Sequence, residues 1–401
     1  MPDPGPATAW SELVATEPLA LVGIEISLVE LALVRPVRTA VGSHDRRPLA
    51  LVRLVATGPD GEVEGWGECA ALAEPGYAPE HAAGAFAVLA TDLVPALVGL
   101  ARAGVPGPAA ARLALATTPA GATSPMAVAA LEMAVADAHL RSGGSSLARA
   151  LGCTRDRVDM AAVVGRDVPE RVAERVAELA AAGFARIRLK IAPGDDAVPL
   201  AAARDAAPEA ALSADANGSY GGRPDAAALL GALDRFGLVF VEQPLGTDDL
   251  AGHASLSRTL STPVCLDESL DTVDRVRLAV ATGACTVACC KPGRLGGIGP
   301  CIDAVSAAAG GGARPWIGGM FESGLGRAVA GALAALGAVS LAGDVSPAAW
   351  YLVEDLAPPP VTGRGDDGRA WVQVHGGPGV GPAPDPQVVS RLRSAVVWVP
   401  A

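Results

Sequence analysis

Short apolar runs recur along the middle of the chain at a nearly constant interval, and each run ends in a charged residue. The five clearest runs end at Lys190, Asp215, Glu242, Asp267 and Lys291, with steps of 25, 27, 25 and 24 residues. An Ala-rich stretch of helical composition fills each interval. Continuous apolar runs without alternation are typical of strands buried on both faces, as in a parallel sheet. The spacing therefore predicts repeated strand–helix units.

Three further runs extend this pattern to eight. Two weaker ones end at Gly319 and Asp344, and the run Val158–Val164 precedes the others. Eight parallel strands with intervening helices close most economically into a barrel, whose active site lies at the carboxyl ends of the strands. An open doubly wound sheet would instead concentrate its polar residues near one switch point. Because the charged residues fall at successive strand ends, we expect an α/β barrel.

The regions outside the barrel lack this period. The first of them continues from strand-like segments into helices, clearest at Pro125–Ser142, and this order is typical of an α+β domain. We expect four parts: a disordered or extended tail over 1–20, an α+β capping domain over 21–155, the barrel over 156–347, and a C-terminal segment over 348–401 that packs on the capping domain.

Composition and charge exclude several classes of partner. The net charge is −12, whereas a nucleic-acid-binding protein needs a basic face. We expect no secretory signal and no membrane span, because the apolar run Ala328–Gly343 is too short and too rich in Ala and Gly. The seven cysteines form no C-x-x-C pair, which favours reduced thiols in a cytoplasmic protein. A zinc site on Cys285 and Cys289 would lack a second ligand pair.

Three carboxylates, those of Asp215, Glu242 and Asp267, end successive strands and would point into one small volume. Without a cation they would repel one another, and some would take up protons. Mg2+ prefers such oxygen ligands and leaves coordination positions for water or substrate. The alternative is that arginines on neighbouring loops pair with these carboxylates. Glu268 either supports this site or pairs with Lys291.

Lys190 and Lys291 are the only lysines among 31 basic residues. Arginine keeps its proton at any accessible pH, whereas a lysine whose pKa is lowered can act as a base. The two lysines end the strands on either side of the three carboxylates, so a barrel would place their amines on opposite sides of a metal. A substrate carboxylate on that metal would present its α-carbon between them, and the metal would stabilise the enolate. This arrangement fits proton abstraction with return on either face, provided that nearby positive charge lowers the lysine pKa values.

Motifs spread over the chain from Leu21 onward are individually weak and jointly specific. They are GWGECAALAEPGY (65–77), ALEMAVADA (130–138), RIRLKIAPG, DAN, VEQPL, CLDES, KPGRLGG, GGMFESGLGRA and GDVS (343–346). In these motifs the chain resembles the enolase superfamily and its muconate-lactonizing-enzyme subgroup. Within that subgroup it most resembles the branch of o-succinylbenzoate synthase and N-acylamino acid racemase.

The resemblance implies a modified TIM barrel, (β/α)7β, with a capping domain built from both chain ends. Loops near Arg38–Ser43 and Ala70–Tyr77 would close over the barrel mouth. It implies Mg2+, with Mn2+ as a substitute, on Asp215, Glu242 and Asp267, and an acid–base pair of Lys190 and Lys291. The implied substrate-binding residues are Arg188, Asn217, Glu268, Arg294, Gly319, Met320, Glu322 and Ser323. The expected partners are a small-molecule carboxylate and further copies of the chain, with no nucleic acid and no membrane.

The chain departs from the family pattern at three positions. Arg188 replaces the first lysine of the usual Lys-x-Lys, a position that needs positive charge and no removable proton. Cys289 stands where relatives often have Asn, and Val163 lies near a common Ser or Thr. The last two departures bear on substrate choice.

Two activities of the branch fit the remaining sequence. The five histidines lie away from the strand ends, and GDVS lacks the Asp-x-Asp of dipeptide epimerases. We favour an Mg-dependent o-succinylbenzoate synthase of the menaquinone pathway. In it, Lys190 removes the α-proton of 2-succinyl-6-hydroxy-2,4-cyclohexadiene-1-carboxylate, water leaves, and Lys291 steadies the enolate. The alternative is an N-succinylamino acid racemase in which both lysines exchange protons.

Two hypotheses from other classes are weaker. A retaining glycosidase barrel would use Glu242 and Glu322 as its carboxylate pair. It would have few aromatic platforms for a sugar, and it would leave both lysines without a role. A barrel that only binds an acid would leave the complete set of five site residues unexplained.

Overall fold

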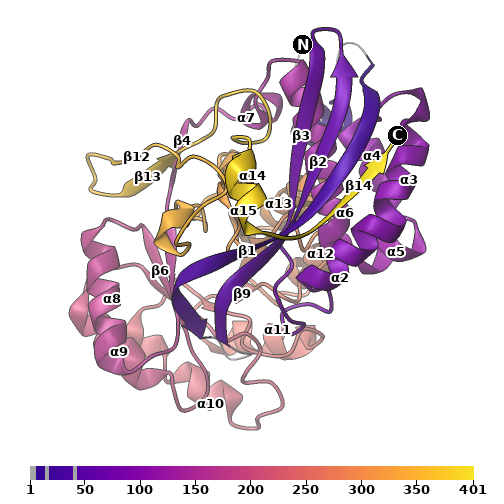
Figure 1. The fold of residues 1–401 in the computed structure, drawn as a ribbon. Coiled ribbons are helices and arrows are strands. Elements are labelled where there is room, and N and C mark those ends of the chain that lie inside the picture. Colours follow the sequence, from indigo (N-terminus) through magenta and orange to yellow (C-terminus); the bar gives the residue numbers. More distant parts are fainter. Residues whose placement is uncertain (1–5, 14–17, 39–42) are drawn as a thin grey trace.

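The computed structural model describes residues 6–13, 18–38 and 43–401. An antiparallel sheet covered by helices lies beside a ring of parallel strands with helices outside it (Figure 1). The expected fold class, a modified TIM barrel with an α+β cap, is confirmed.

The barrel is formed by seven parallel strands that neighbour one another in chain order. They are β5 (Ala161–Val164), β6 (Arg186–Lys190), β7 (Leu212–Asp215), β8 (Val241–Glu242), β9 (Val264–Leu266), β10 (Val287–Cys290) and β11 (Arg314–Ile317). The eighth predicted run forms no named strand. Its residues Gly343 and Asp344 join the two edge strands instead: the Gly343 carbonyl accepts from Ala161 N at 2.8 Å, and Asp344 N donates to the Ile317 carbonyl at 2.9 Å.

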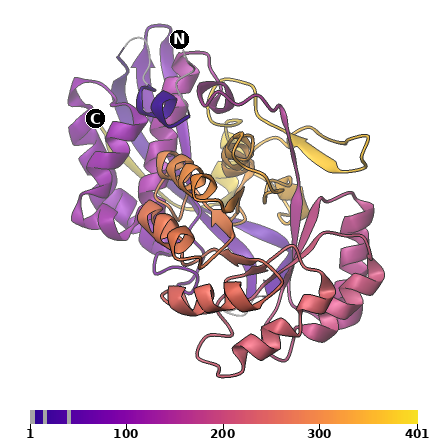
Figure 2. The same cartoon turned by 180° about the vertical axis from the view of Figure 1, so that it is seen from behind.

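Helices surround the barrel on the outside (Figure 2). They are α8 (Pro169–Ala181), α9 (Ala197–Ala206), α10 (Ala226–Gly231), α11 (Leu250–Thr259), α12 (Val273–Ala281), α13 (Ile298–Gly310) and α14 (Gly324–Ala334). Helix α8 shows why they form. Pro169 occupies its first turn, and Val172, Val176 and Leu179 recur at helical spacing and are buried against the barrel.

The cap is a four-stranded antiparallel sheet in the order β14-β1-β2-β3. Its strands are β1 (Ala20–Arg38), β2 (Ser43–Gly58), β3 (Gly61–Cys69) and β14 (Arg393–Pro400). Helices α2 (Ala82–Val88), α3 (Val94–Leu100), α4 (Pro108–Ala116), α5 (Pro119–Thr123) and α6 (Pro125–Ser142) accompany it. Strand β14 brings the C-terminus to β1, so both ends of the chain contribute to this sheet (Figure 1).

Two expectations about the N-terminal half need correction. The tail expected to be disordered or extended contains helix α1 (Pro6–Ser11), which is held because Trp10 is buried and donates from Nε1 to Glu132 at 3.0 Å. The single strand expected at Val158–Val164 is divided. Its first part, β4 (Arg157–Asp159), leaves the barrel and pairs with the C-terminal segment, and only β5 enters the barrel.

The C-terminal segment contributes to several parts of the fold. Strands β12 (Thr362–Arg364) and β13 (Ala370–Gln373) form a small antiparallel sheet with β4. Helix α15 (Pro386–Leu392) follows and packs near β1 before the chain continues into β14. In the loop expected near Arg38–Ser43, residues 39–42 lie outside the described part of the chain.

One helical stretch in the described residues is long and apolar enough to cross a membrane by length and composition alone. It is Ala82–Ala103, with a mean hydropathy of 1.8. Its buried residues Ala85, Leu89 and Leu93 belong to the same core as the cap strands. The inward face therefore accounts for part of its apolar character, as expected of a helix that packs on a sheet.

Close packing of β3 on α6 gives a stability prediction. A Cβ at Gly67 would overlap the backbone carbonyl of Ala130 in α6, and a backbone cannot rotate away as a side chain can. We expect Gly67→Ala to lower the free energy of unfolding by about 3 kcal/mol, measured by urea titration. Gly99→Ala in α3 is the matched control. Nothing lies within 4 Å of its Cβ position, so it should stabilise the protein slightly. Equal stability of the two variants would contradict this packing.

Candidate active site

The predicted acidic residues meet at one end of the barrel. Asp215 and Glu242 are the last residues of β7 and β8, and Asp267 directly follows β9. Their side chains are buried. In register, Asp215 lies opposite both Lys190 at the end of β6 and Glu242. The short, regular strand–helix units thus place successive strand ends at a common rim.

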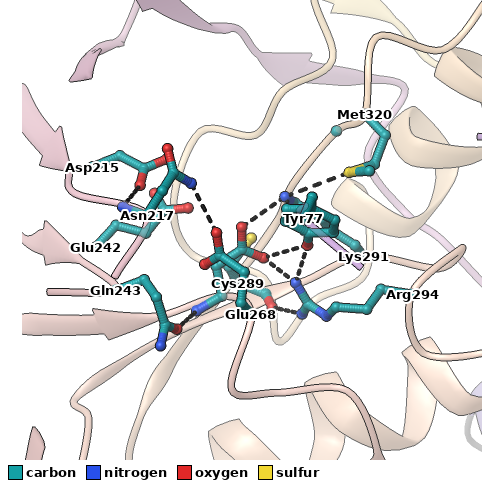
Figure 3. A network of polar contacts seen from close by, with 12 residues as sticks. Tyr77, Asp215, Asn217, Glu242, Gln243, Glu268, Cys289, Lys291, Arg294 and Met320 are labelled. Atoms are coloured by element: carbon teal, nitrogen blue, oxygen red, sulfur yellow. Dashed lines mark hydrogen bonds and ion pairs between the residues drawn. The ribbon is translucent and has the colours of Figure 1, made fainter. Parts of the chain in front are cut away.

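Each lysine amine contacts one of these carboxylates. Lys190 Nζ donates to Asp215 Oδ2 at 2.6 Å and to Asn217 Oδ1 at 2.9 Å. Lys291 Nζ donates to Asp267 Oδ2 at 2.7 Å and contacts the Tyr77 hydroxyl at 3.1 Å (Figure 3). Three strands, β7, β8 and β9, separate the strands that carry the two lysines. The amines therefore approach the barrel mouth from different sides.

Burial and acidic neighbours act in opposite directions on the pKa of Lys291. Burial is the largest single influence and lowers the pKa of this amine, but Asp267, Tyr77 and Cys289 together raise the pKa well above its ordinary value. The expected lowering depends on a bound metal together with an arginine, so it stays a prediction for the metal-loaded site. The contact with Lys291 also acts on the carboxylate, since Lys291 and Arg294 together overcome burial and lower the pKa of Asp267.

Arg188 connects two buried carboxylates below the mouth. Its Nη1 donates to both oxygens of Glu242 at 2.8 and 3.0 Å, and its Nη2 donates to Asp344 Oδ2 at 2.7 Å. Burial nevertheless raises the pKa of Glu242 to about 8, and the charges of Asp215 and Asp267 add to this shift. The arginine alone does not offset the cost of burying so much negative charge.

The donor set fits a divalent cation. Glu242, Asp267 and Cys289 bring ligand atoms within 4.8 Å of one another, while Asp215 lies outside this group. Burial raises the pKa of the Cys289 thiol well above its ordinary value, and a neutral thiol is a poor ligand for a hard ion. Glu268 Oε2 is buried and has no hydrogen-bond partner among the described residues. Burial, Asp267 and Asp215 raise the pKa of Glu268 to about 7, so local negative charge is in excess.

A cavity of about 120 Å³ opens between these groups and the cap. Seven predicted site residues line it: Arg188, Lys190, Asn217, Asp267, Lys291, Gly319 and Met320. Asp215 and Glu242 are not among the residues that line it. Four predicted substrate-binding residues, Glu268, Arg294, Glu322 and Ser323, do not line it.

The hydrogen bonds of Arg294 and Ser323 explain why these two residues do not line the cavity. Arg294 is buried and donates to the carbonyls of Leu270 and Cys289, at 3.0 and 2.7 Å, and to Asp267. Ser323 caps helix α14 and donates from its backbone N to Glu68 Oε1 at 3.0 Å. These side chains hold neighbouring elements in place and do not face the cavity.

Comparison with known proteins agrees with this geometry. Residues 23–152 match the N-terminal domain of mandelate racemase and muconate lactonizing enzyme, and residues 171–388 match the profile described as enolase C-terminal domain-like. The chain belongs to the enolase superfamily. The resemblance inferred from the sequence motifs is thus confirmed.

Within the enolase superfamily, several relatives match along nearly the whole chain. An N-succinylamino acid racemase of Amycolatopsis is 38% identical, covering 95% of this chain and all of the relative. An o-succinylbenzoate synthase of Bacillus subtilis is 33% identical over 89% of this chain and 93% of its own. The solved structure of a probable mandelate racemase from Alicyclobacillus acidocaldarius is 38% identical, with a TM-score of 0.82 over 95% of this chain and 99% of its own.

The cap supplies a site residue that sequence reasoning did not single out. Tyr77 follows β3, and its hydroxyl lies 3.0 Å from Asp267 Oδ1 and 2.6 Å from Arg294 Nη1 (Figure 3). The ring also lies 4.4 Å from the Lys291 amine, measured to the ring centroid. Tyr77 ends the motif GWGECAALAEPGY, which marks this segment as important. The motif does not reveal the contact between Tyr77 and Lys291, because these residues are 214 positions apart.

A second cap residue shapes the loop after β11. Arg47 of β2 is buried and donates from Nε to the carbonyls of Met320 and Phe321, at 3.0 and 3.2 Å. Phe321 has a φ of 56°, a left-handed conformation that costs energy in a residue with a side chain. Arg47 thereby ties the strained backbone beside the cavity to the cap.

Glu68 gives a pH prediction for the contact between cap and barrel. Burial raises the pKa of Glu68 from 4.5 to about 7. The folded state then binds this proton more tightly than the unfolded state, so stability falls as pH rises from about 4.5 to about 7. The glutamine of Glu68→Gln cannot ionise. Over this pH range we therefore expect the free energy of unfolding of the variant to fall by up to about 3 kcal/mol less than that of wild type.

The measurement is urea unfolding between pH 4.5 and 7.5. Glu62→Gln, at an exposed position of the same strand, controls for the loss of one negative charge. Parallel stability curves for wild type and Glu68→Gln would contradict the shifted pKa.

Proposed function

We propose that this chain is an N-succinylamino acid racemase that transfers the α-proton of its substrate between two lysines. The observation that carries the proposal is the pair of amines on one cavity, Lys190 from the end of β6 and Lys291 from the end of β10. They are the only two lysines of the chain. Racemisation needs one base and one acid on opposite faces of the same carbon, and this pair supplies both.

The residues around the lysines support this chemistry. Asp215 and Asn217 hold the Lys190 amine, while Asp267 and Tyr77 hold that of Lys291. One neutral lysine takes the α-proton, and the opposite protonated lysine returns a proton to the other face. Each step leaves the two amines with exchanged protonation states, so the site is ready for the reverse direction.

We propose that Asp215, Glu242 and Asp267 hold a divalent cation, Mg2+ by preference. When bound, it supplies a Lewis acid that lowers the cost of placing negative charge on the substrate carboxylate as the α-proton leaves. Arg188 orients Glu242 for this role through two hydrogen bonds, and its charge acts against the rise that burial causes in the pKa of Glu242. The buried site also limits access of water, which strengthens these electrostatic interactions.

The racemase is favoured over the synthase preferred from the sequence. The racemase relative covers more of this chain at higher identity, 38% against 33% for the synthase. The synthase stays the second candidate, because the Lys291 amine donates to Asp267, and an amine held by a carboxylate suits a cation that only steadies an intermediate. A glycosidase is not proposed, since Glu322 does not line the cavity and its Oε1 accepts from Met320 N.

Lysine variants test the proposed roles. Lys190→Arg and Lys291→Arg keep the positive charge and remove the transferable proton. We expect each to slow racemisation of N-succinyl-phenylalanine by about 1,000-fold while retaining α-proton exchange for one enantiomer only, the opposite one in each variant. Chiral chromatography and proton NMR in deuterium oxide measure these quantities. A variant that still racemises near the wild-type rate would exclude its lysine from the mechanism.

Metal removal tests the carboxylate site. After dialysis against a chelator we expect racemisation to stop, and addition of Mg2+ or Mn2+ to restore it. Because a bound ion also relieves repulsion among buried carboxylates, Mg2+ should raise the thermal unfolding midpoint. Asp215→Asn, Glu242→Gln and Asp267→Asn should each weaken that rise. Full activity in the chelated protein would contradict a metal role.

A further inference from the structure

A buried arginine on the barrel side of the cavity has almost no hydrogen-bond partners. Arg327 of α14 lines the cavity and is 7% exposed. Its Nε donates to the Tyr351 hydroxyl at 2.5 Å and lies 3.5 Å from Glu322 Oε2. Neither Nη nitrogen has a hydrogen-bond partner among the residues that the structure describes, and Nη1 is fully buried. A buried donor without an acceptor is costly, so such groups usually have a functional reason.

Tyr351 holds this guanidinium in a fixed orientation. Its ring centroid lies 4.7 Å from Arg327 Cζ, and its hydroxyl donates to the Glu322 carbonyl at 2.5 Å. The same ring packs edge-on against Phe321 at 5.5 Å. The guanidinium is thus stacked and anchored through Nε, while its outer nitrogens are left without partners.

The position of Arg327 defines a direction for the substrate. A Cβ added at Gly319 would lie 2.6 Å from Arg327 Nη1, and Gly319 follows β11. The carboxylates proposed to hold the metal lie elsewhere on the rim: Asp215 and Glu242 end β7 and β8, and Asp267 directly follows β9. A substrate whose α-carboxylate faces Asp267 and whose α-carbon lies between the lysines therefore extends its other end toward Arg327.

We propose that Arg327 receives the terminal carboxylate of the succinyl group and so selects a dianionic acyl chain. This inference rests on the proposed function and names a specificity residue for it. Nη1 is fully buried, whereas Nη2 is not among the buried unpartnered atoms, so Nη2 can donate to a substrate carboxylate in a charge-assisted contact. Arg175 also lines the cavity, but its Nη1 already contacts Glu178 Oε2 at 2.5 Å.

The experiment compares two substrates that differ only in charge. They are an N-succinyl amino acid and its N-succinamoyl analogue, in which an amide replaces the terminal carboxylate. We expect wild type to prefer the succinyl substrate by about 100-fold in kcat/KM, since a buried charge pair loses that much when one partner is neutral. Arg327→Met should abolish this preference by slowing only the succinyl substrate. Arg175→Met, the matched arginine variant, should keep it.

A second variant and a set of contradicting outcomes complete the test. Arg327→Lys retains the charge without the planar guanidinium that Tyr351 anchors, and it should show an intermediate preference even if Arg327→Met fails to fold. A wild type that turns over both substrates equally would overturn this inference alone, as would a preference that disappears in Arg175→Met. Equal losses on both substrates in a folded Arg327→Met would indicate a structural role and also overturn it. A wild type that exchanges no α-proton would overturn the proposed function together with this inference.

Discussion

Burial of charge at the strand ends is the constraint on which the rest of the structure depends. Arg188 lies beneath the mouth and joins Glu242 of β8 to Asp344 of the segment that closes the barrel. Its guanidinium also lies 4.8 Å from the ring centroid of Trp316 inside the barrel. One fixed cation therefore links barrel closure with orientation of a candidate metal ligand. A lysine there would offer a single point charge and not two directed contacts.

The cap depends on the barrel through similar buried contacts. Arg47 holds the loop after β11, Glu68 binds Ser323 at the start of α14, and Tyr77 reaches Asp267 and Lys291. These links bring the two sides of the cavity together. Small movements of the cap would therefore change the surroundings of one lysine, and the strained Phe321 backbone marks where the two parts meet.

The amino-acid sequence predicted the barrel and the strand-end residues because a strand–helix unit has a nearly fixed length. The constant spacing of the apolar runs, and the charged residue that ends each run, together locate the barrel mouth. It did not predict the surroundings of those residues. Tyr77 and Arg327 act through contacts whose direction depends on how the cap and α14 pack. Ser323 belongs to the same motif as Gly319 but begins a helix, which turns its hydroxyl toward Glu68.

In the proposed mechanism, two lysines face one α-carbon from opposite sides. Racemisation of a single enantiomer in deuterium oxide tests this arrangement, with deuterium content followed separately in product and remaining substrate. We expect product formed in the first turnovers to carry deuterium at the α-carbon, because a second, solvent-equilibrated lysine delivers it, while the remaining substrate keeps its proton. Product that retains the original proton would show a single base acting on both faces and would contradict the two-lysine mechanism.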